Sequence, residues 1–157
     1  MLTGTESPAH VGDVVRLKEA GLRVTAPRLA ILEALRSLDH PSVDAVTEAV
    51  LERLGAVSTQ AVYDILGAFT AAGFVRRIEP AGSPALFEGR VGDNHHHLIC
   101  RVCGAVADVD CATGHAPCLT PSERAGFLVD EAEVIYWGVC PSCQGARVSP
   151  EGGKAHA

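Results

Sequence analysis

Two Cys-x-x-Cys pairs place the strongest constraint on this chain: Cys100 and Cys103 in "CRVC", and Cys140 and Cys143 in "CPSC". Each pair lets two thiolates converge on one ion, and two pairs complete a tetrahedral four-thiolate site, which suits Zn²⁺. Because 36 residues separate Cys103 from Cys140, the ion would join the two ends of a small β-rich module. Structural zinc contributes roughly 10–16 kcal/mol to the folding of such modules. We therefore expect these four cysteines to bind structural Zn²⁺.

Two other uses of paired cysteines are redox chemistry and iron–sulfur clusters. Redox-active pairs usually accompany a thioredoxin-like βαβ unit, which the surrounding sequence does not suggest, and clusters usually place three cysteines closer together. The remaining cysteines, Cys111 and Cys118 in "CATGHAPC", could form a conditional disulfide, or Cys118 could simply be buried. We expect no essential role for them, and a redox role stays open.

Length and charge set broader limits. The 157 residues suit one domain or two small ones. No apolar run approaches the roughly 18 residues of a membrane span, and "MLTGTESPAH" lacks a signal-peptide pattern. We therefore expect a cytoplasmic protein, in which thiols stay reduced. The net charge of −6 argues against a generic nucleic-acid binder. Since the part after Ser83 holds 5 basic and 9 acidic residues, it carries −4 of that charge, and a basic face on the first half remains open.

The first half predicts helices over residues 11–20, 25–38, 42–54 and 58–73. Thr25, Ser42 and Ser58 are the expected N-caps, and Gly21 and Gly73 the expected stops. The turn "AGSP" between "FVRRIEP" and "ALFEGR" then predicts a β-hairpin. Helices followed by a hairpin are the order of a winged helix-turn-helix, although a plain helical bundle would give a similar pattern.

In a winged helix-turn-helix the last helix enters the DNA major groove with its N-terminal residues at the base edges, and hairpin arginines meet phosphates. Arginines near the start of the second predicted helix are further candidates for backbone contacts. The expected DNA-binding residues are therefore Arg23, Arg28, Ser58, Thr59, Gln60, Tyr63, Arg76 and Arg77.

The second half predicts strands in "HHHLICRV", "GAVADVD" and "AEVIYWGVC", with a short helix in "PSERAGF" capped by Thr120. The Gly-rich end, residues 149–157, is expected to be disordered. In "DNHHHLIC", His95 and His97 are two apart on a strand and share a face, whereas His96 and Cys100 have the opposite parity. Solvated loop histidines are the simplest alternative. We expect His95 and His97 to serve a second metal site, with Asp108 within reach on the next strand.

A mixed histidine and carboxylate site suits Fe²⁺, Mn²⁺ or Zn²⁺ and binds more weakly than a thiolate cage. Such a site is filled or empty according to conditions, which is the chemistry of a sensor.

These residues resemble the ferric uptake regulator (Fur) family from about Leu17 to Cys143. The resemblance rests on "LRVTAPRLAILEAL", "DHPSVDAV", "VSTQAVYDILGAFTAAGFVRRI", "DNHHHLICRVCGAVADVD" and "YWGVCPSC". It implies an α+β fold: an N-terminal winged helix-turn-helix DNA-binding domain at 1–84, a hinge at 85–92, and a C-terminal α/β dimerisation and metal-binding domain at 93–148. It also implies a homodimeric, metal-dependent transcriptional repressor that binds double-stranded palindromic operator DNA.

The resemblance further implies a regulatory Fe²⁺ or Mn²⁺ site made of His40, Glu88, His95, His97 and Asp108. The ion would draw ligands from both domains and favour the form that fits a palindrome. Peroxide-sensing members carry Asp at the position of Asp108, where iron-level sensors commonly carry Glu. In those members bound Fe²⁺ reduces hydrogen peroxide and a ligating histidine gains oxygen, which here would be His40 or His95. "QAVYDILGAFTAAG" and "VGDNHHHLICR" also look like actinobacterial regulators associated with catalase-peroxidase genes.

The chain departs from the family pattern at three positions. Asp64 stands where the family often has Arg directly after the recognition-helix Tyr, so a contact to DNA at that place is not expected. Asn94 and Ala132 stand where some members have ligands of a further metal site, which we do not predict here, although His96 or Glu131 could substitute.

Three alternatives to a peroxide-responsive repressor stay open. They are an iron- or manganese-level sensor, a metalloenzyme built on His95, His97 and Asp108, and a zinc-ribbon interaction module. No phosphate loop or nucleophile motif supports an enzyme, so we expect none.

Overall fold

The computed structural model describes residues 8–93, 95–110, 122–129 and 133–147. The chain divides into two compact units, Met1–Gly92 and Asp93–Ala157. The first is helical with a small hairpin, and the second is built on a three-stranded sheet. This is the predicted α+β class. None of the helices in the described part of the chain is both long and apolar enough to cross a membrane.

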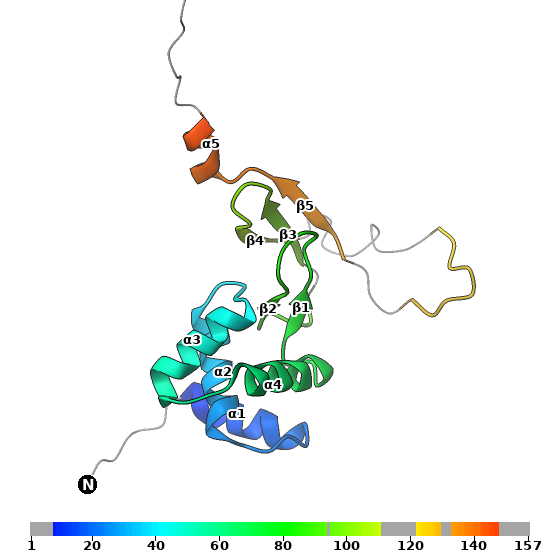
Figure 1. Ribbon diagram of the computed structural model, residues 1–157. Coiled ribbons are helices and arrows are strands. Elements are labelled where there is room, and N and C mark those ends of the chain that lie inside the picture. Colours follow the sequence, from blue (N-terminus) through cyan, green and yellow to red (C-terminus); the bar gives the residue numbers. More distant parts are fainter. Residues whose placement is uncertain (1–7, 94, 111–121, 130–132, 148–157) are drawn as a thin grey trace, which may run out of the picture. The chain divides into compact units, whose positions relative to one another are not determined.

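The first unit contains four helices and a two-stranded sheet (Figure 1). The helices are α1 (Pro8–Glu19), α2 (Ala26–Ser37), α3 (Val43–Leu54) and α4 (Thr59–Ala71), and the strands are β1 (Arg76–Ile78) and β2 (Leu86–Glu88). β1 and β2 pair antiparallel, with Arg76 opposite Glu88. The winged-helix order predicted from the sequence is therefore observed. Part of the segment predicted as a hinge, residues 86–88, forms β2.

The predicted helix boundaries are largely confirmed. Ser42 and Ser58 cap α3 and α4, because their hydroxyls accept hydrogen bonds from the backbone N–H groups of Ala45 and Ala61. Thr25 occupies the N-cap position of α2 but makes no side-chain capping bond. Its helix instead begins with Pro27 in the first turn, where the absent N–H costs nothing.

The core of the first unit collects the apolar faces of its helices and hairpin. Leu17 of α1, Ile31 of α2, Val46 of α3 and Leu66 of α4 are all fully buried. Phe69 of α4 stacks against Phe74, which follows the end of that helix, and the two ring centroids are 5.5 Å apart. Burial of a side chain of this size stabilises the fold by roughly 1.5–3 kcal/mol. The apolar face of α4 is therefore packed in the core, and the opposite face of this helix is exposed.

The second unit contains β3 (His95–Cys100), β4 (Val106–Asp110), β5 (Ile135–Gly138) and α5 (Pro141–Arg147). β3 is the central strand; β4 pairs with it antiparallel and β5 pairs with it parallel. The three predicted strands are thus observed, with shorter bounds. Helix α5, which begins directly after Cys140, is not among the elements predicted from the sequence.

The helix predicted in "PSERAGF" is wrong for the residues that the structure describes, 122–129. Ala125 and Gly126 have positive φ angles of 44° and 83°, which a right-handed helix does not accept. The N–H of Phe127 donates to the carbonyl of Arg124 at 2.8 Å, so the chain makes an isolated turn there. Thr120, its expected cap, lies outside the described residues, as do Cys111, Cys118 and the predicted disordered tail at 149–157.

Candidate metal centres

The four-cysteine group is assembled by the parallel pairing of β3 with β5. This pairing sets Cys100 opposite Gly138, so that both strands end side by side and the two Cys-x-x-Cys turns meet. Gly104, at φ 75°, turns the chain back after the first pair, and its N–H donates to the carbonyl of Cys100 at 2.9 Å. The second pair spans the start of α5. The Sγ atoms of Cys100, Cys103, Cys140 and Cys143 all lie within 4.8 Å of one another.

The spacing of these sulfur atoms fits one tetrahedral ion. Tetrahedral Zn²⁺ with Zn–S bonds of ~2.3 Å separates its sulfur ligands by about 3.8 Å. The Sγ atoms of Cys103 and Cys140 are 3.7 Å apart. The donor set is therefore that of a closed structural zinc site, as predicted from the sequence.

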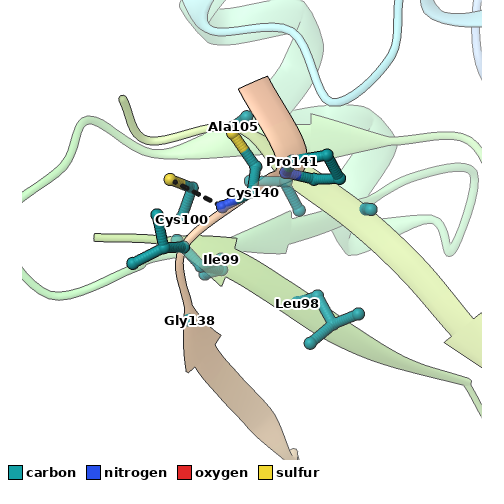
Figure 2. Close-up of a pocket in the computed structure, with 10 residues that line it drawn as sticks. Leu98, Ile99, Cys100, Ala105, Gly138, Cys140 and Pro141 are labelled. Carbon is teal, nitrogen blue, oxygen red and sulfur yellow. Dashed lines mark hydrogen bonds between the residues drawn. The ribbon is translucent and has the colours of Figure 1, made fainter. Parts of the chain in front are cut away.

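Backbone N–H groups prepare part of this site for a thiolate. The N–H of Cys140 donates to the Sγ of Cys100 at 3.3 Å, and Figure 2 shows this bond beside the apolar residues Leu98, Ile99 and Pro141. Hydrogen bonds from the backbone of Cys140, and then of Cys103 and Val102, lower the pKa of Cys100 to about 6.

The fourth thiol has the opposite shift. Hydrogen bonds to Cys140 and Cys103 raise the pKa of Cys143 to about 12. Four thiolates at this spacing repel one another, so a cation is needed to hold them all deprotonated.

A second group of candidate ligands begins in the first unit with His40 and Glu88. Ser42 forms an isolated antiparallel bridge with Leu86, and the N–H of Phe87 donates to the carbonyl of Pro41 at 3.0 Å. Continuing this register places His40 opposite Glu88. Both side chains are buried, and Nε2 of His40 lies 3.2 Å from Oε2 of Glu88.

Two further features of this pair concern charge and backbone strain. Arg76, opposite Glu88 in the hairpin, brings its guanidinium nitrogen within 3.6 Å of Oε1 of that carboxylate. His40 has a φ angle of 45°, in the left-handed region that residues other than glycine rarely adopt. Strain of this kind costs on the order of 1–3 kcal/mol and gathers at functional sites.

The remaining candidate ligands lie in the second unit, on one face of the β3–β4 ladder. The register places His97 directly opposite Asp108, and Nε2 of His97 lies 3.7 Å from Oδ1 of that carboxylate. The rings of His95 and His97 contact each other edge to face, with centroids 5.0 Å apart. On the other face His96 contacts the ring of Tyr136. His95 and His97 therefore share a face, as their strand parity predicted, and Asp108 of the next strand lies within reach of His97, as expected.

Two carboxylates near these histidines are absent from the residues predicted from the sequence. Oδ1 of Asp93 lies 2.6 Å from Nδ1 of His95, and Oε1 of Glu133 lies 3.9 Å from Nδ1 of His97. Carboxylates commonly orient ligating histidines by accepting a hydrogen bond from the ring nitrogen that does not bind the metal. The position of Asp93, two residues before His95 with the same strand parity, is the signal that could have identified it.

The residues predicted to contact DNA are distributed over the first unit. Thr59, Gln60 and Tyr63 are exposed on α4, and Ser58 uses its hydroxyl to cap that helix. Arg28 donates to the backbone carbonyl of Arg23 at 2.8 Å.

The two hairpin arginines both have acidic partners. Arg77 pairs with the neighbouring Glu79, and Arg76 faces Glu88 as described above. Their contacts with DNA remain predictions.

The profile of the Ferric uptake regulator family matches residues 19–135. Transcriptional regulator FurA of Mycobacterium tuberculosis is 60% identical over 128 residues, which cover 82% of this chain and 87% of that protein. Ferric uptake regulation protein 1 of Mycolicibacterium fortuitum is 55% identical over 140 residues, or 89% and 87% of the two chains. The solved structure of the ferric uptake regulator from Pseudomonas aeruginosa with manganese is 30% identical, with a TM-score of 0.66 over 82% of this chain and 98% of that one. The chain therefore belongs to the ferric uptake regulator family, whose members are metal-responsive transcriptional regulators and not enzymes.

Proposed function

We propose that this chain is a homodimeric repressor that binds palindromic operator DNA when its regulatory metal is bound, and that hydrogen peroxide releases it by oxidising a ligating histidine. In this proposal the cysteine site holds structural Zn²⁺, and the regulatory ion is Fe²⁺ or Mn²⁺. The protein would act in the cytoplasm, as we expect from the sequence.

This proposal rests mainly on one observation: the buried His95 and His97 of β3 lie on the same face of the sheet as the half-buried Asp108 of β4. A cation bound on this face would contact both imidazoles and the carboxylate of Asp108 in a place that is largely shielded from water. Imidazole nitrogens and a carboxylate oxygen side by side are donors that Fe²⁺ and Mn²⁺ accept. We assign His40 and Glu88, which form a second buried histidine–carboxylate pair, to the same ion, as the family resemblance implies.

The peroxide response depends on which metal is bound. Bound Fe²⁺ would supply the redox chemistry for the reaction, in which one oxygen of hydrogen peroxide adds to a ring carbon of a ligating histidine and the other leaves as water, whereas Mn²⁺ would not. His40 and His95 are the proposed targets, because oxidation of either ring would remove a nitrogen donor and weaken metal binding. Asp108, in place of the longer Glu, supports the peroxide-sensing subtype.

The second candidate function is a regulator of iron or manganese levels without peroxide chemistry. The name of the Mycolicibacterium fortuitum relative, Ferric uptake regulation protein 1, favours it, as does the manganese in the Pseudomonas aeruginosa structure. Both functions use the same proposed ligands, so only the chemistry of the bound metal separates them.

Peptide mass spectrometry of the Fe²⁺-loaded protein after brief peroxide exposure tests the proposal. Trypsin releases His40 in "SLDHPSVDAVTEAVLER" and His95 in "VGDNHHHLICR", and fragmentation of these peptides assigns an added oxygen to one residue. We expect oxygen on His40 or His95 with Fe²⁺, none with Mn²⁺, and none on His10, which serves as the internal control. Unmodified histidines with metal-dependent DNA binding intact would establish the metal-level sensor, and oxidation confined to Cys111 and Cys118 would indicate a thiol switch.

The ligand assignment has a separate test. His40→Ala should abolish metal-dependent binding to duplexes selected from a randomised pool, whereas the matched variant His10→Ala should retain it. Equal retention in both variants would remove His40 from the proposed site.

A further inference from the structure

The exposed face of α4 carries a single charged side chain, Asp64, and this side chain is hydrogen-bonded to Gln60. Nε2 of Gln60 donates to Oδ1 of Asp64 at 2.8 Å, and both residues are exposed. They are four apart on the helix and therefore lie on the same face, together with the exposed Tyr63. Helix α4 contains no Lys or Arg. A face of this composition is poorly suited to phosphates, which are bound mainly by cations.

The hydrogen bond fixes which way the Gln60 amide points. A carboxylate only accepts hydrogen bonds, so the amide nitrogen, and not the amide oxygen, must face Asp64. The bond uses one N–H of Gln60. The amide oxygen and the second N–H then form an acceptor–donor pair of fixed orientation. This pair matches the N6–H donor and N7 acceptor that adenine presents in the major groove.

The negative charge of Asp64 also favours contacts with bases over contacts with phosphates. A carboxylate repels the DNA backbone, so it lowers the affinity of this face for phosphates wherever the helix lies along the duplex. The face therefore gains little from DNA of arbitrary sequence. This face of α4 can instead bind DNA through contacts between the oriented Gln60 amide and the edge of a base.

We propose that Asp64 is a positioning residue that holds Gln60 for reading an adenine, so that the pair sets one A·T position in each half of the operator. This inference rests on the proposed DNA-binding function. It gives a role to the residue at which the chain departs from the Arg that the family often carries. The competing explanation is that the Gln60–Asp64 bond only stabilises the exposed helix, as such pairs do in isolated helices.

Selection of binding sites from a randomised duplex pool separates the two explanations. The full-length zinc-containing protein would be loaded with Mn²⁺, and selected duplexes would be sequenced for the unaltered chain and for Gln60→Ala, Asp64→Ala and Asp64→Asn. Glu19→Gln, an exposed acid at the end of α1, serves as the charge control. Melting curves of each variant would check that α4 remains folded.

We expect Gln60→Ala and Asp64→Ala to lose the preference for adenine at the same position, from about ten-fold or more to about two-fold, because a bidentate contact supplies that discrimination. Asp64→Asn should keep only part of the preference, because an asparagine amide can accept from Gln60 through its oxygen or donate to Gln60 through its nitrogen, and so no longer fixes the orientation of Gln60. It should also bind random duplex about two- to five-fold more tightly at low salt, because a charge repelled by phosphate is gone. Glu19→Gln should select the unaltered motif.

Two results would overturn the inference: an unaltered motif with Asp64→Ala, or an unaltered motif with Gln60→Ala. If the unaltered Mn²⁺-loaded protein enriches no sequence at all, the proposed DNA-binding function fails instead. That failure is distinguishable because it appears without any substitution.

Discussion

The two units of this chain are stabilised by different means. Of the residues that the structure describes, the first unit buries fifteen apolar side chains in one cluster. The second buries Ile99 and Cys100 together with three consecutive histidines of β3. Several of its large apolar side chains, such as Phe127 and Leu128, are exposed. The first unit therefore has an ordinary hydrophobic core, and the described part of the second does not.

Because the second unit buries few apolar side chains, we expect the four-cysteine site to contribute to its folding and the histidine site to contribute little. A small sheet that buries few apolar groups gains little from the hydrophobic effect, so other interactions must offset its loss of chain entropy. Four thiolates that converge on one ion can supply that stabilisation. The proposed histidine and carboxylate site in the same sheet has donors that bind divalent metals more weakly than a thiolate cage does, which suits sensing better than folding. The comparison predicts that metal and core substitutions act on separate units.

Removal of zinc should have the largest effect. Cys140→Ser, or extraction of the metal with a strong chelator, should unfold the second unit, because roughly 10–16 kcal/mol of metal binding is lost. The first unit should keep its helices and its own unfolding transition. Hydrogen exchange resolved by peptide, with circular dichroism, measures both units in one sample.

The matched control for this substitution is Cys118→Ser, which removes a thiol outside the proposed site. It should leave zinc content and exchange unchanged. Protection of β3 and β5 that survives in zinc-free Cys140→Ser would show that the sheet does not depend on the ion.

Truncation in the apolar core is the converse substitution. Leu66 is fully buried on α4, so Leu66→Ala should lower the free energy of unfolding of the first unit by about 2–5 kcal/mol. Leu51 on α3 is 40% exposed, so Leu51→Ala should cost less than about 1 kcal/mol. Urea denaturation followed by circular dichroism gives both values, and zinc content should not change. Equal losses in the two variants would contradict the assigned core.

The sequence predicted the first unit well because its signals are local. The caps Ser42 and Ser58 and the stop Gly73 follow from backbone hydrogen bonding and steric freedom, and they appear where they were expected. The Cys-x-x-Cys spacing likewise predicted which thiols meet, although it offered no reason to expect helix α5 after Cys140.

The sequence failed where side-chain pattern and backbone conformation disagree. "PSERAGF" has helix-forming residues, but Ala125 and Gly126 both take positive φ, which composition does not reveal. Asp93 could have been identified from its position two residues before His95, but the carboxylate of Glu133 comes close to His97 only in the folded sheet. Contacts of this kind depend on tertiary structure, which one sequence does not encode in any short pattern.

The smallest expected effects concern Arg36, which pairs with two carboxylates of different burial. Its guanidinium lies 2.8 Å from Oδ2 of the buried Asp13 and 2.7 Å from Oε2 of the half-exposed Glu33. Asp13→Ala leaves Arg36 without its partner on α1, so it should destabilise the first unit by about 1–3 kcal/mol. Glu33→Gln should cost about 0.2–1 kcal/mol, because water screens the pair. Urea denaturation of the two variants measures both losses, and a larger loss in Glu33→Gln would contradict the role assigned to burial.

The dependence on pH distinguishes Glu33 further. The hydrogen bond from Arg36 lowers the pKa of Glu33 from its usual value of 4.5. A lowered pKa in the folded state adds stability that is fully present above about pH 4.5 and is lost as the pH falls through the folded-state pKa. Thermal unfolding of the first unit between pH 7 and pH 3 should therefore show a larger acid loss in the unaltered chain than in Glu33→Gln. If the two curves remained parallel, the pair would contribute nothing, and the hydrophobic cluster together with Asp13 would account for how α1 and α2 are held.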